Sequence, residues 1–456
     1  MKNKKLRKMM KGLLVSTMAL SMCLGTTGTV FASEHKQDGN NQYMEGTQQN
    51  PAEAYITKNL KMAEGMNTPE GKFLFKFDKV SEDGNPTTTN AMPSINDKEI
   101  AYNAERLVAT EGLIQAKNIS ENIVAGLTFG HAGEYVYKVT EKSEFKDYNH
   151  GQLQPNEFMD YSKAEYTMTV VVANKLELDA DGNTIPNKFV PKTGGGYETY
   201  IKYIAVEKEK DDKGQETNGK VDPENDLGKN TFTFENTFTR IGNTVPNKPG
   251  EPGYPMDPDD PTKPDTNYPD DPNYPGIPVD PTNPEGHNSL TISKTVTKDG
   301  DLSKDFNFTL TLQKSKTEAD SVTSYKAYRI DQNGTSTPIT VPVGDAKTFI
   351  LKHNEKLVFP LLPVGTKYTI SETAAQGYTT TLETKEDGKN AVTETSATAT
   401  DKLIGDETNY AKYTNEKPST PPTGILINNL PFIMLIIVAI GAFAAFIVSK
   451  RHKRAR

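Results

Sequence analysis

Two sets of one lysine, one glutamate and one asparagine occur in the same order along the chain, and each set could form a covalent bond. The sets are Lys58, Glu141 and Asn236, and Lys294, Glu372 and Asn415. A neutral lysine amine can attack the side-chain carbonyl of asparagine while a protonated glutamate polarises that carbonyl and relays protons. Ammonia would leave, and an intramolecular Lys-Asn isopeptide bond would remain.

The residues around these side chains place them on the apolar faces of strands. Side chains two residues apart point to the same side of a strand, so Lys58 shares a face with Ile56, and Asn236 shares one with Phe234. The same parity holds for Glu141 and for the second set. Burial of a lone lysine or glutamate is costly, and it lowers the pKa of the amine and raises that of the carboxyl. The duplicated pattern favours covalent chemistry over an ordinary hydrogen-bonded core cluster.

Alternating apolar and polar residues predict the strands that carry these side chains. Such runs lie at 73–77, 134–139, 166–172, 231–234, 290–293, 306–312 and 368–371. We expect an all-β fold of two Ig-like β-sandwich domains in series, at 53–242 and 289–417. A short helix is expected within 101–116.

The segment 243–288 carries a proline at about every third residue, with aspartates between them. Such a density of proline predicts an extended, semi-rigid linker that joins the two domains. The aspartates indicate a solvated charge run rather than a calcium site.

The composition excludes several classes of site. The formal net charge of −8 argues against nucleic-acid binding, and the single cysteine, Cys23, leaves no disulfide in the mature chain. The six histidines show no metal-binding spacing, and the residues from Asp179 to Asn183 favour a hairpin turn over a calcium loop. We expect no metal, no cofactor and no turnover of an external substrate.

The N-terminus has the form of a secretory signal peptide. A basic start precedes an apolar run from Gly12 to Leu24, and small residues favour cleavage after Ala32. The expected order is therefore a signal peptide at 1–32, which includes Cys23, and a flexible segment at 33–52.

The C-terminus resembles the sorting signal of sortase substrates. The motif Thr-Pro-Pro-Thr-Gly at 420–424 precedes an apolar span at 430–448, which is long enough for a membrane helix, and a basic tail at 450–456. The resemblance implies cleavage between Thr423 and Gly424 and transfer of Thr423 to an amine. Thr420 stands where the commonest motif has leucine, so the sortase class stays open.

Both halves resemble Gram-positive pilin subunits of the T-antigen type, which form their own isopeptide bonds. The most specific stretches are residues 133–141, 290–294, 303–308 and 362–365. The resemblance implies a bond from Lys58 to Asn236 promoted by Glu141. It likewise implies a second bond, from Lys294 to Asn415 promoted by Glu372.

A polymerising pilin also needs a lysine that accepts the Thr423 of a neighbour. Lys229 has the parity of Thr231 and Thr233, opposite to Asn236, and the resemblance places the acceptor here. Lys192, in Val-Pro-Lys-Thr, is the alternative.

The leading hypothesis is a shaft subunit of a cell-surface pilus. Its implied partners are a sortase, copies of itself, ancillary pilins and peptidoglycan. A tip adhesin or a monomeric wall-anchored adhesin built from the same domains is the alternative.

Overall fold

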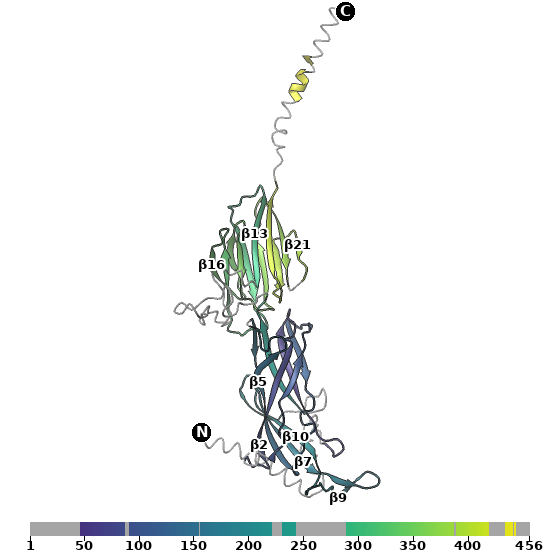
Figure 1. Cartoon of the computed structure of the whole chain (residues 1–456). Coiled ribbons are helices and arrows are strands. Elements are labelled where there is room, and N and C mark those ends of the chain that lie inside the picture. Colours follow the sequence, from purple (N-terminus) through teal and green to yellow (C-terminus); the bar gives the residue numbers. More distant parts are fainter. Residues whose placement is uncertain are drawn as a thin grey trace, which may run out of the picture.

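The computed structural model describes residues 46–86, 91–154, 156–220, 230–242, 289–386, 389–418, 434–440 and 442–443. These residues form two β units stacked end to end (Figure 1). The predicted all-β fold is confirmed.

The first unit packs a four-stranded sheet, β4-β1-β12-β6, against a six-stranded sheet, β11-β10-β7-β5-β2-β3. A separate hairpin, β8-β9, extends from it. Its strands are β1 (Ala54–Ala63), β2 (Gly71–Glu82), β3 (Lys98–Tyr102), β4 (Leu113–Ile119), β5 (Gly133–Asp147), β6 (Glu157–Asp160), β7 (Glu165–Asn174), β8 (Leu176–Leu178), β9 (Thr184–Phe189), β10 (Thr199–Lys210), β11 (Glu216–Lys220) and β12 (Asn230–Arg240).

The second unit has a seven-stranded sheet, β16-β15-β18-β13-β23-β20-β21, and a four-stranded sheet, β17-β14-β19-β22. Its strands are β13 (Leu290–Lys298), β14 (Phe306–Gln313), β15 (Ser324–Ile330), β16 (Ser336–Pro342), β17 (Lys347–Leu351), β18 (Lys356–Phe359), β19 (Lys367–Glu372), β20 (Thr379–Lys385), β21 (Val392–Glu394), β22 (Thr398–Leu403) and β23 (Tyr410–Lys417).

In both units the first strand lies parallel to the last. β1 pairs with β12 so that Leu60 faces Asn236, and β13 pairs with β23 so that Val296 faces Asn415. Parallel neighbours require a long connection, and the rest of each unit supplies it. The first and last strands of each unit therefore lie side by side in one sheet.

The expected helix within 101–116 is wrong. Strands β3 and β4 flank an irregular stretch there, and Gly112 has a φ of 81°. Ile100 and Tyr102 are buried, as are Ile114 and Ala116, while the residue between each pair is exposed. That period of two suits a strand at the surface of a core rather than a helix.

The two units touch directly. The backbone N–H of Gly242 donates to the carbonyl of Leu362 over 3.0 Å, and the N–H of Leu362 donates to Ser289 Oγ over 3.0 Å. Segment 243–288 lies outside the described residues, but the residues that flank it meet at Leu362. The extended, semi-rigid linker that we expected at 243–288 stays a prediction, while the units on either side of it are in contact at Gly242 and Leu362.

Several expected features also lie outside the described residues. They are the signal peptide at 1–32, Lys229, the motif at 420–424 and the basic tail at 450–456. Of the expected span at 430–448, residues 434–440 and 442–443 are described and helical. Among the residues that the structure describes, no helix has the length and apolarity needed to cross a membrane.

Candidate functional site

The first site lies between the two sheets of the first unit. Lys58 comes from β1, Glu141 from β5 and Asn236 from β12. Lys58 Nζ donates to Glu141 Oε2 over 2.7 Å, and Asn236 Nδ2 donates to Glu141 Oε1 over 2.7 Å. All three side chains are buried. One carboxylate therefore bridges the amine and the carboxamide.

The environment of this site disfavours charge. Lys58 Nζ lies 4.6 Å from the centroid of the Phe73 ring. Burial lowers the pKa of Lys58 to about 8, although Glu141 opposes the shift. Burial also raises the pKa of Glu141, against the influence of Lys58. The two shifts bring the amine and the carboxyl toward sharing one proton, which favours the neutral amine that a nucleophile requires.

The second site repeats this arrangement. Lys294 Nζ donates to both carboxylate oxygens of Glu372, over 2.9 and 2.8 Å, and Asn415 Nδ2 donates to Glu372 Oε1. Lys294 Nζ lies 4.1 Å from the Phe306 ring centroid, and burial lowers the pKa of Lys294 to about 8. Each unit thus contains one such site, which links its own first strand to its own last strand.

The carboxamides are oriented differently from our expectation. We expected each glutamate to lie against the asparagine carbonyl, but Glu141 and Glu372 both contact the carboxamide nitrogen. In the first site the oxygen, Asn236 Oδ1, accepts the backbone N–H of Ser162 over 2.7 Å. In the second, Asn415 Oδ1 is buried without a hydrogen-bond partner in the described part of the chain. The glutamates are placed to protonate a departing nitrogen.

Of the two proposed acceptor lysines, only Lys192 lies within the described residues. Lys229 lies just outside the described residues, one position before β12. Lys192 is exposed, in a turn where its N–H donates to the carbonyl of Gly196 over 3.0 Å. That turn follows β9, which lies at the end of the first unit away from the second (Figure 1).

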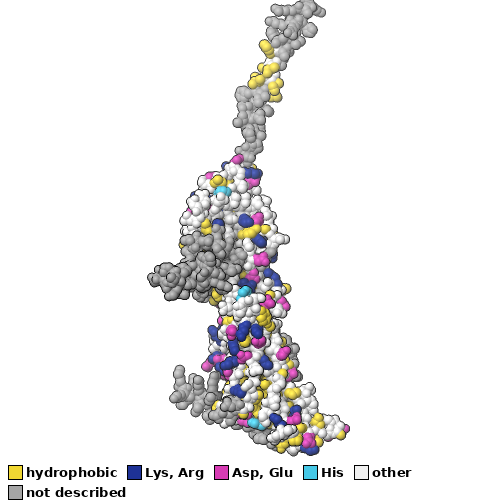
Figure 2. Space-filling model, in the orientation of Figure 1, with side chains coloured by type: hydrophobic (Ala, Val, Ile, Leu, Met, Phe, Trp, Pro, Cys, Tyr) yellow, Lys and Arg dark blue, Asp and Glu magenta, His cyan; other side chains and the backbone are white. Residues whose placement is uncertain are grey.

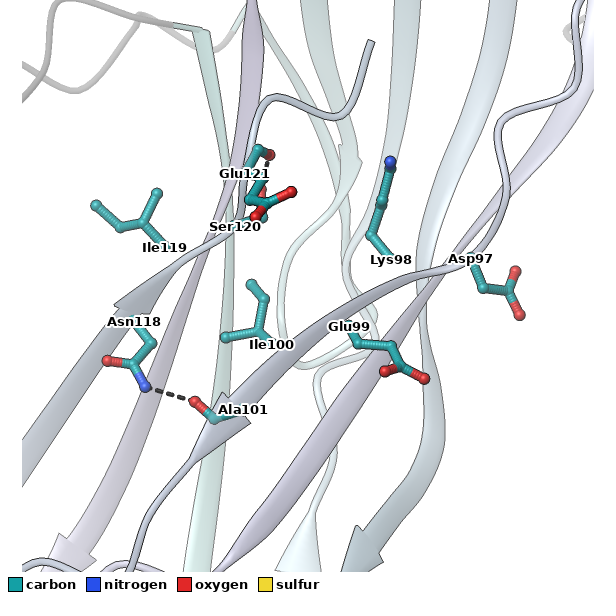
Figure 3. A pocket seen from close by; sticks show the side chains of 9 residues that line it. All are labelled: Asp97, Lys98, Glu99, Ile100, Ala101, Asn118, Ile119, Ser120 and Glu121. Atoms are coloured by element: carbon teal, nitrogen blue, oxygen red, sulfur yellow. Dashed lines mark hydrogen bonds between the residues drawn. The ribbon is translucent and has the colours of Figure 1, made fainter. Parts of the chain in front are cut away.

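The surface offers no comparable chemical site in the described residues. A shallow groove separates the edge strands β3 and β4, where Asn118 Nδ2 donates to the carbonyl of Ala101 over 2.6 Å (Figure 3). Lysine, arginine and acidic side chains are interspersed over the face seen in Figure 2. Asp179 Oδ1 accepts the N–H groups of Asp181 and Asn183, so this stretch is the turn that we predicted.

Sequence comparisons relate the chain to pilus proteins. It is 32% identical over 169 residues to a pilin of Streptococcus pyogenes serotype M1. The aligned residues make up 36% of this chain and 48% of that pilin. It is 38% identical over 139 residues to the pilus tip adhesin Cpa of Streptococcus pyogenes, which covers 30% of this chain and 18% of the adhesin. The chain resembles Gram-positive pilus subunits.

The matches are partial. The chain spans about half the length of the related pilin and about a fifth of the adhesin. Residues 288–417 match a domain family of unknown function, DUF7601. A crystal structure of the major pilin of Streptococcus pyogenes aligns with 81% of this chain and 99% of its own, at 20% identity and a TM-score of 0.31.

Proposed function

We propose that this chain is a shaft subunit of a sortase-assembled pilus, stiffened by one Lys-Asn isopeptide bond in each unit. The observation that carries the proposal is the duplicated buried site, in which a glutamate joins a lysine of the first strand to an asparagine of the last. Such a bond would carry tension from one end of a unit to the other without loading its sheets. The similarity to a streptococcal pilin supports this use.

The site geometry supports the following reaction in the first unit. Neutral Lys58 Nζ attacks Asn236 Cγ, and the amine proton passes to Glu141 Oε2. Glu141 Oε1 transfers its own proton to Nδ2, which leaves as ammonia. One C–N bond forms and one breaks, and Glu141 ends protonated as it began. The second site would react in the same way through Glu372.

The intact mass of the folded chain tests the internal bonds. Mature protein should be lighter than its sequence by two ammonia molecules. Glu141→Ala should restore one ammonia, and the matched Glu372→Ala variant should restore the other. Peptide mapping should join Lys58 to Asn236 and Lys294 to Asn415. A mass equal to that of the sequence would rule out both bonds.

Polymerisation requires a separate test. We propose that a sortase joins Thr423 to Lys229 of the next subunit, with Lys192 as the alternative acceptor, and that peptidoglycan receives the last subunit. Wall extracts boiled in detergent should show a ladder of multimers that disappears in Lys229→Ala and persists in Lys192→Ala. The reverse pattern would assign Lys192. A single monomer band would reject the shaft role.

A tip adhesin is the second candidate, favoured by the similarity to Cpa. Such a subunit would be joined once to a pilus through Thr423 and would accept no neighbour. Electron microscopy with antibodies to this chain separates the two roles, because a shaft subunit is labelled along the fibre and a tip subunit only at its end.

A further inference from the structure

The oxygen of the Asn236 carboxamide has a dedicated backbone donor. Ser162, in the connection between β6 and β7, places its N–H 2.7 Å from Asn236 Oδ1. Ser162 is 5% exposed, and Asn236 is fully buried. A buried amide aimed at the oxygen of a reacting carbonyl has the geometry of an oxyanion donor.

Asp212 holds this donor in place. Ser162 Oγ donates to Asp212 Oδ1 over 2.6 Å, and the same oxygen accepts the backbone N–H of Glu235 over 2.9 Å. The N–H of Lys163 also donates to the Asp212 carbonyl over 2.9 Å. One aspartate therefore ties the Ser162 segment to the residue before Asn236.

These contacts fix which way the carboxamide faces. A rotation that exchanged its nitrogen and oxygen would set Nδ2 against the Ser162 N–H, where two donors meet. The present orientation presents the oxygen to Ser162 and the nitrogen to Glu141. In the second site no group in the described residues holds Asn415 Oδ1 in this way.

We propose that the Ser162 backbone N–H stabilises the oxyanion formed when Lys58 attacks Asn236, with Asp212 as the residue that positions it. The inference rests on the proposed crosslinking function. As Nζ bonds to Cγ, the carbonyl electron pair moves to Oδ1, where the Ser162 N–H donates to it. When the pair returns, the bond to Nδ2 breaks, and Glu141 supplies the proton that releases ammonia. The second unit would react without an equivalent donor among the residues that the structure describes.

The test compares the two bonds in the same molecule. Full-length mature chain recovered unfolded from inclusion bodies is refolded, stopped in denaturant at intervals and analysed by peptide mass. The rate at which the Lys294-Asn415 bond forms in the same molecule serves as the internal reference, which we call the clock. Ser162→Pro removes the N–H and Ser162→Ala retains it. Asp212→Ala removes the positioning oxygen, whereas Asp212→Asn keeps an oxygen that can accept both hydrogen bonds.

Loss of an oxyanion donor typically slows a reaction by about 10²-fold or more. We expect Ser162→Pro to slow formation of the Lys58-Asn236 bond to about that extent and Asp212→Ala to slow it by about tenfold. The Lys294-Asn415 bond should form at an unchanged rate in both variants. Asp212→Asn should restore the wild-type rate at neutral pH, where the rate does not depend on pH. Because the charge of Asp212 raises the pKa of Lys58, this variant should also move the alkaline limb of the rate profile to lower pH.

The outcomes separate this inference from the proposed function. If wild-type chain forms neither bond, the crosslinking proposal itself fails. If both bonds form and Asp212→Ala matches wild type, the oxyanion inference is overturned. Should Ser162→Pro not fold, the comparison of Asp212→Ala with Asp212→Asn still decides, since equal slowing of both would point to charge rather than position.

Discussion

At the level of single residues, the two buried lysines depend on their glutamates. Lys58 and Lys294 are fully buried, and each amine contacts a carboxylate and an aromatic ring. A buried ion pair gains little net stability after desolvation, whereas removing one partner is strongly destabilising. A covalent bond removes this cost, because an amide nitrogen carries no charge at any ordinary pH.

The rate of bond formation should therefore fall at alkaline pH. In the proposed reaction the lysine-glutamate pair holds one proton, which must remain to protonate the departing nitrogen. Because the pKa of Lys58 is lowered to about 8 rather than 10.5, the pair loses that proton as pH rises through about 8. Refolding from the unfolded state at pH 6 to 10, followed by mass analysis, should show rates that decline above pH 8.

The second unit supplies the control for this profile, since the pKa of Lys294 is also lowered to about 8. Both bonds should have their alkaline limb in the same range. A rate that keeps rising to pH 10 would mean that the free amine, and not the protonated pair, is the reactive form.

At the level of elements, the parallel pairing of β1 with β12 and of β13 with β23 would make the proposed bonds mechanically useful. A pull applied at the two ends of a unit's chain acts on its first and last strands, which the proposed bond would join. The loop from Lys58 to Asn236 would then stay closed under load. In the chain-entropy model, closing a loop of this size adds about 5 kcal/mol to stability.

Single-molecule stretching should reveal the closed loops. Wild-type chain should show no release of the residues between Lys58 and Asn236 before the tether breaks. Glu141→Ala should release about 600 Å of chain from the first unit, because an extended residue spans about 3.4 Å. Glu372→Ala should instead release about 400 Å from the second unit. A 600 Å step in wild-type chain would show that the bond does not bear the load.

At the level of the whole molecule, a set of contacts around Arg240 and Val364, which we call the joint, holds the two units together. Arg240 Nη2 donates to Glu157 Oε1 over 2.8 Å, and Nη1 donates to Asp406 of the second unit over 2.9 Å. The N–H of Val364 donates to the Arg240 carbonyl over 2.8 Å, and the Val364 side chain packs into the core of the first unit. The joint combines backbone, charged and apolar contacts.

Removal of the proline-rich segment should leave this joint intact. Gly242 and Ser289 both bond to Leu362, so a few glycine and serine residues can replace 246–285. We expect an unchanged melting temperature and unchanged overall dimensions by small-angle X-ray scattering. Shortening of the particle on deletion would show that the segment contributes to the spacing of the two units.

Loss of the Arg240 side chain should loosen the joint. Arg240→Ala would remove the guanidinium that contacts the partly buried Glu157 and Asp406, at a cost of about 1–2 kcal/mol. Spin labels placed in the two units should give a broader distance distribution in this variant than in wild type. Arg240→Lys, which keeps the charge but not the forked geometry, should be intermediate. An unchanged distribution in Arg240→Ala would assign the rigidity to the backbone contacts alone.

The sequence by itself predicted several of the strands with their buried faces, and it singled out the six residues that the structure brings together in two buried clusters. Alternation with a period of two and the recurrence of Lys, Glu and Asn are local properties, and so they can be read without coordinates. The same information predicted a helix at 101–116, where only the burial of alternate side chains against the core decides for strands.

Only the tertiary structure decided how the site atoms face one another and how the units meet. The donor on Asn236 comes from Ser162, 74 residues away, and its support comes from Asp212; no spacing in the sequence signals either. Likewise, the proline content of 243–288 does not reveal that Gly242 and Ser289 share Leu362. Hydrogen bonds between distant segments depend on how whole sheets pack; local residue patterns show which face of a strand is buried but do not specify which distant groups meet there.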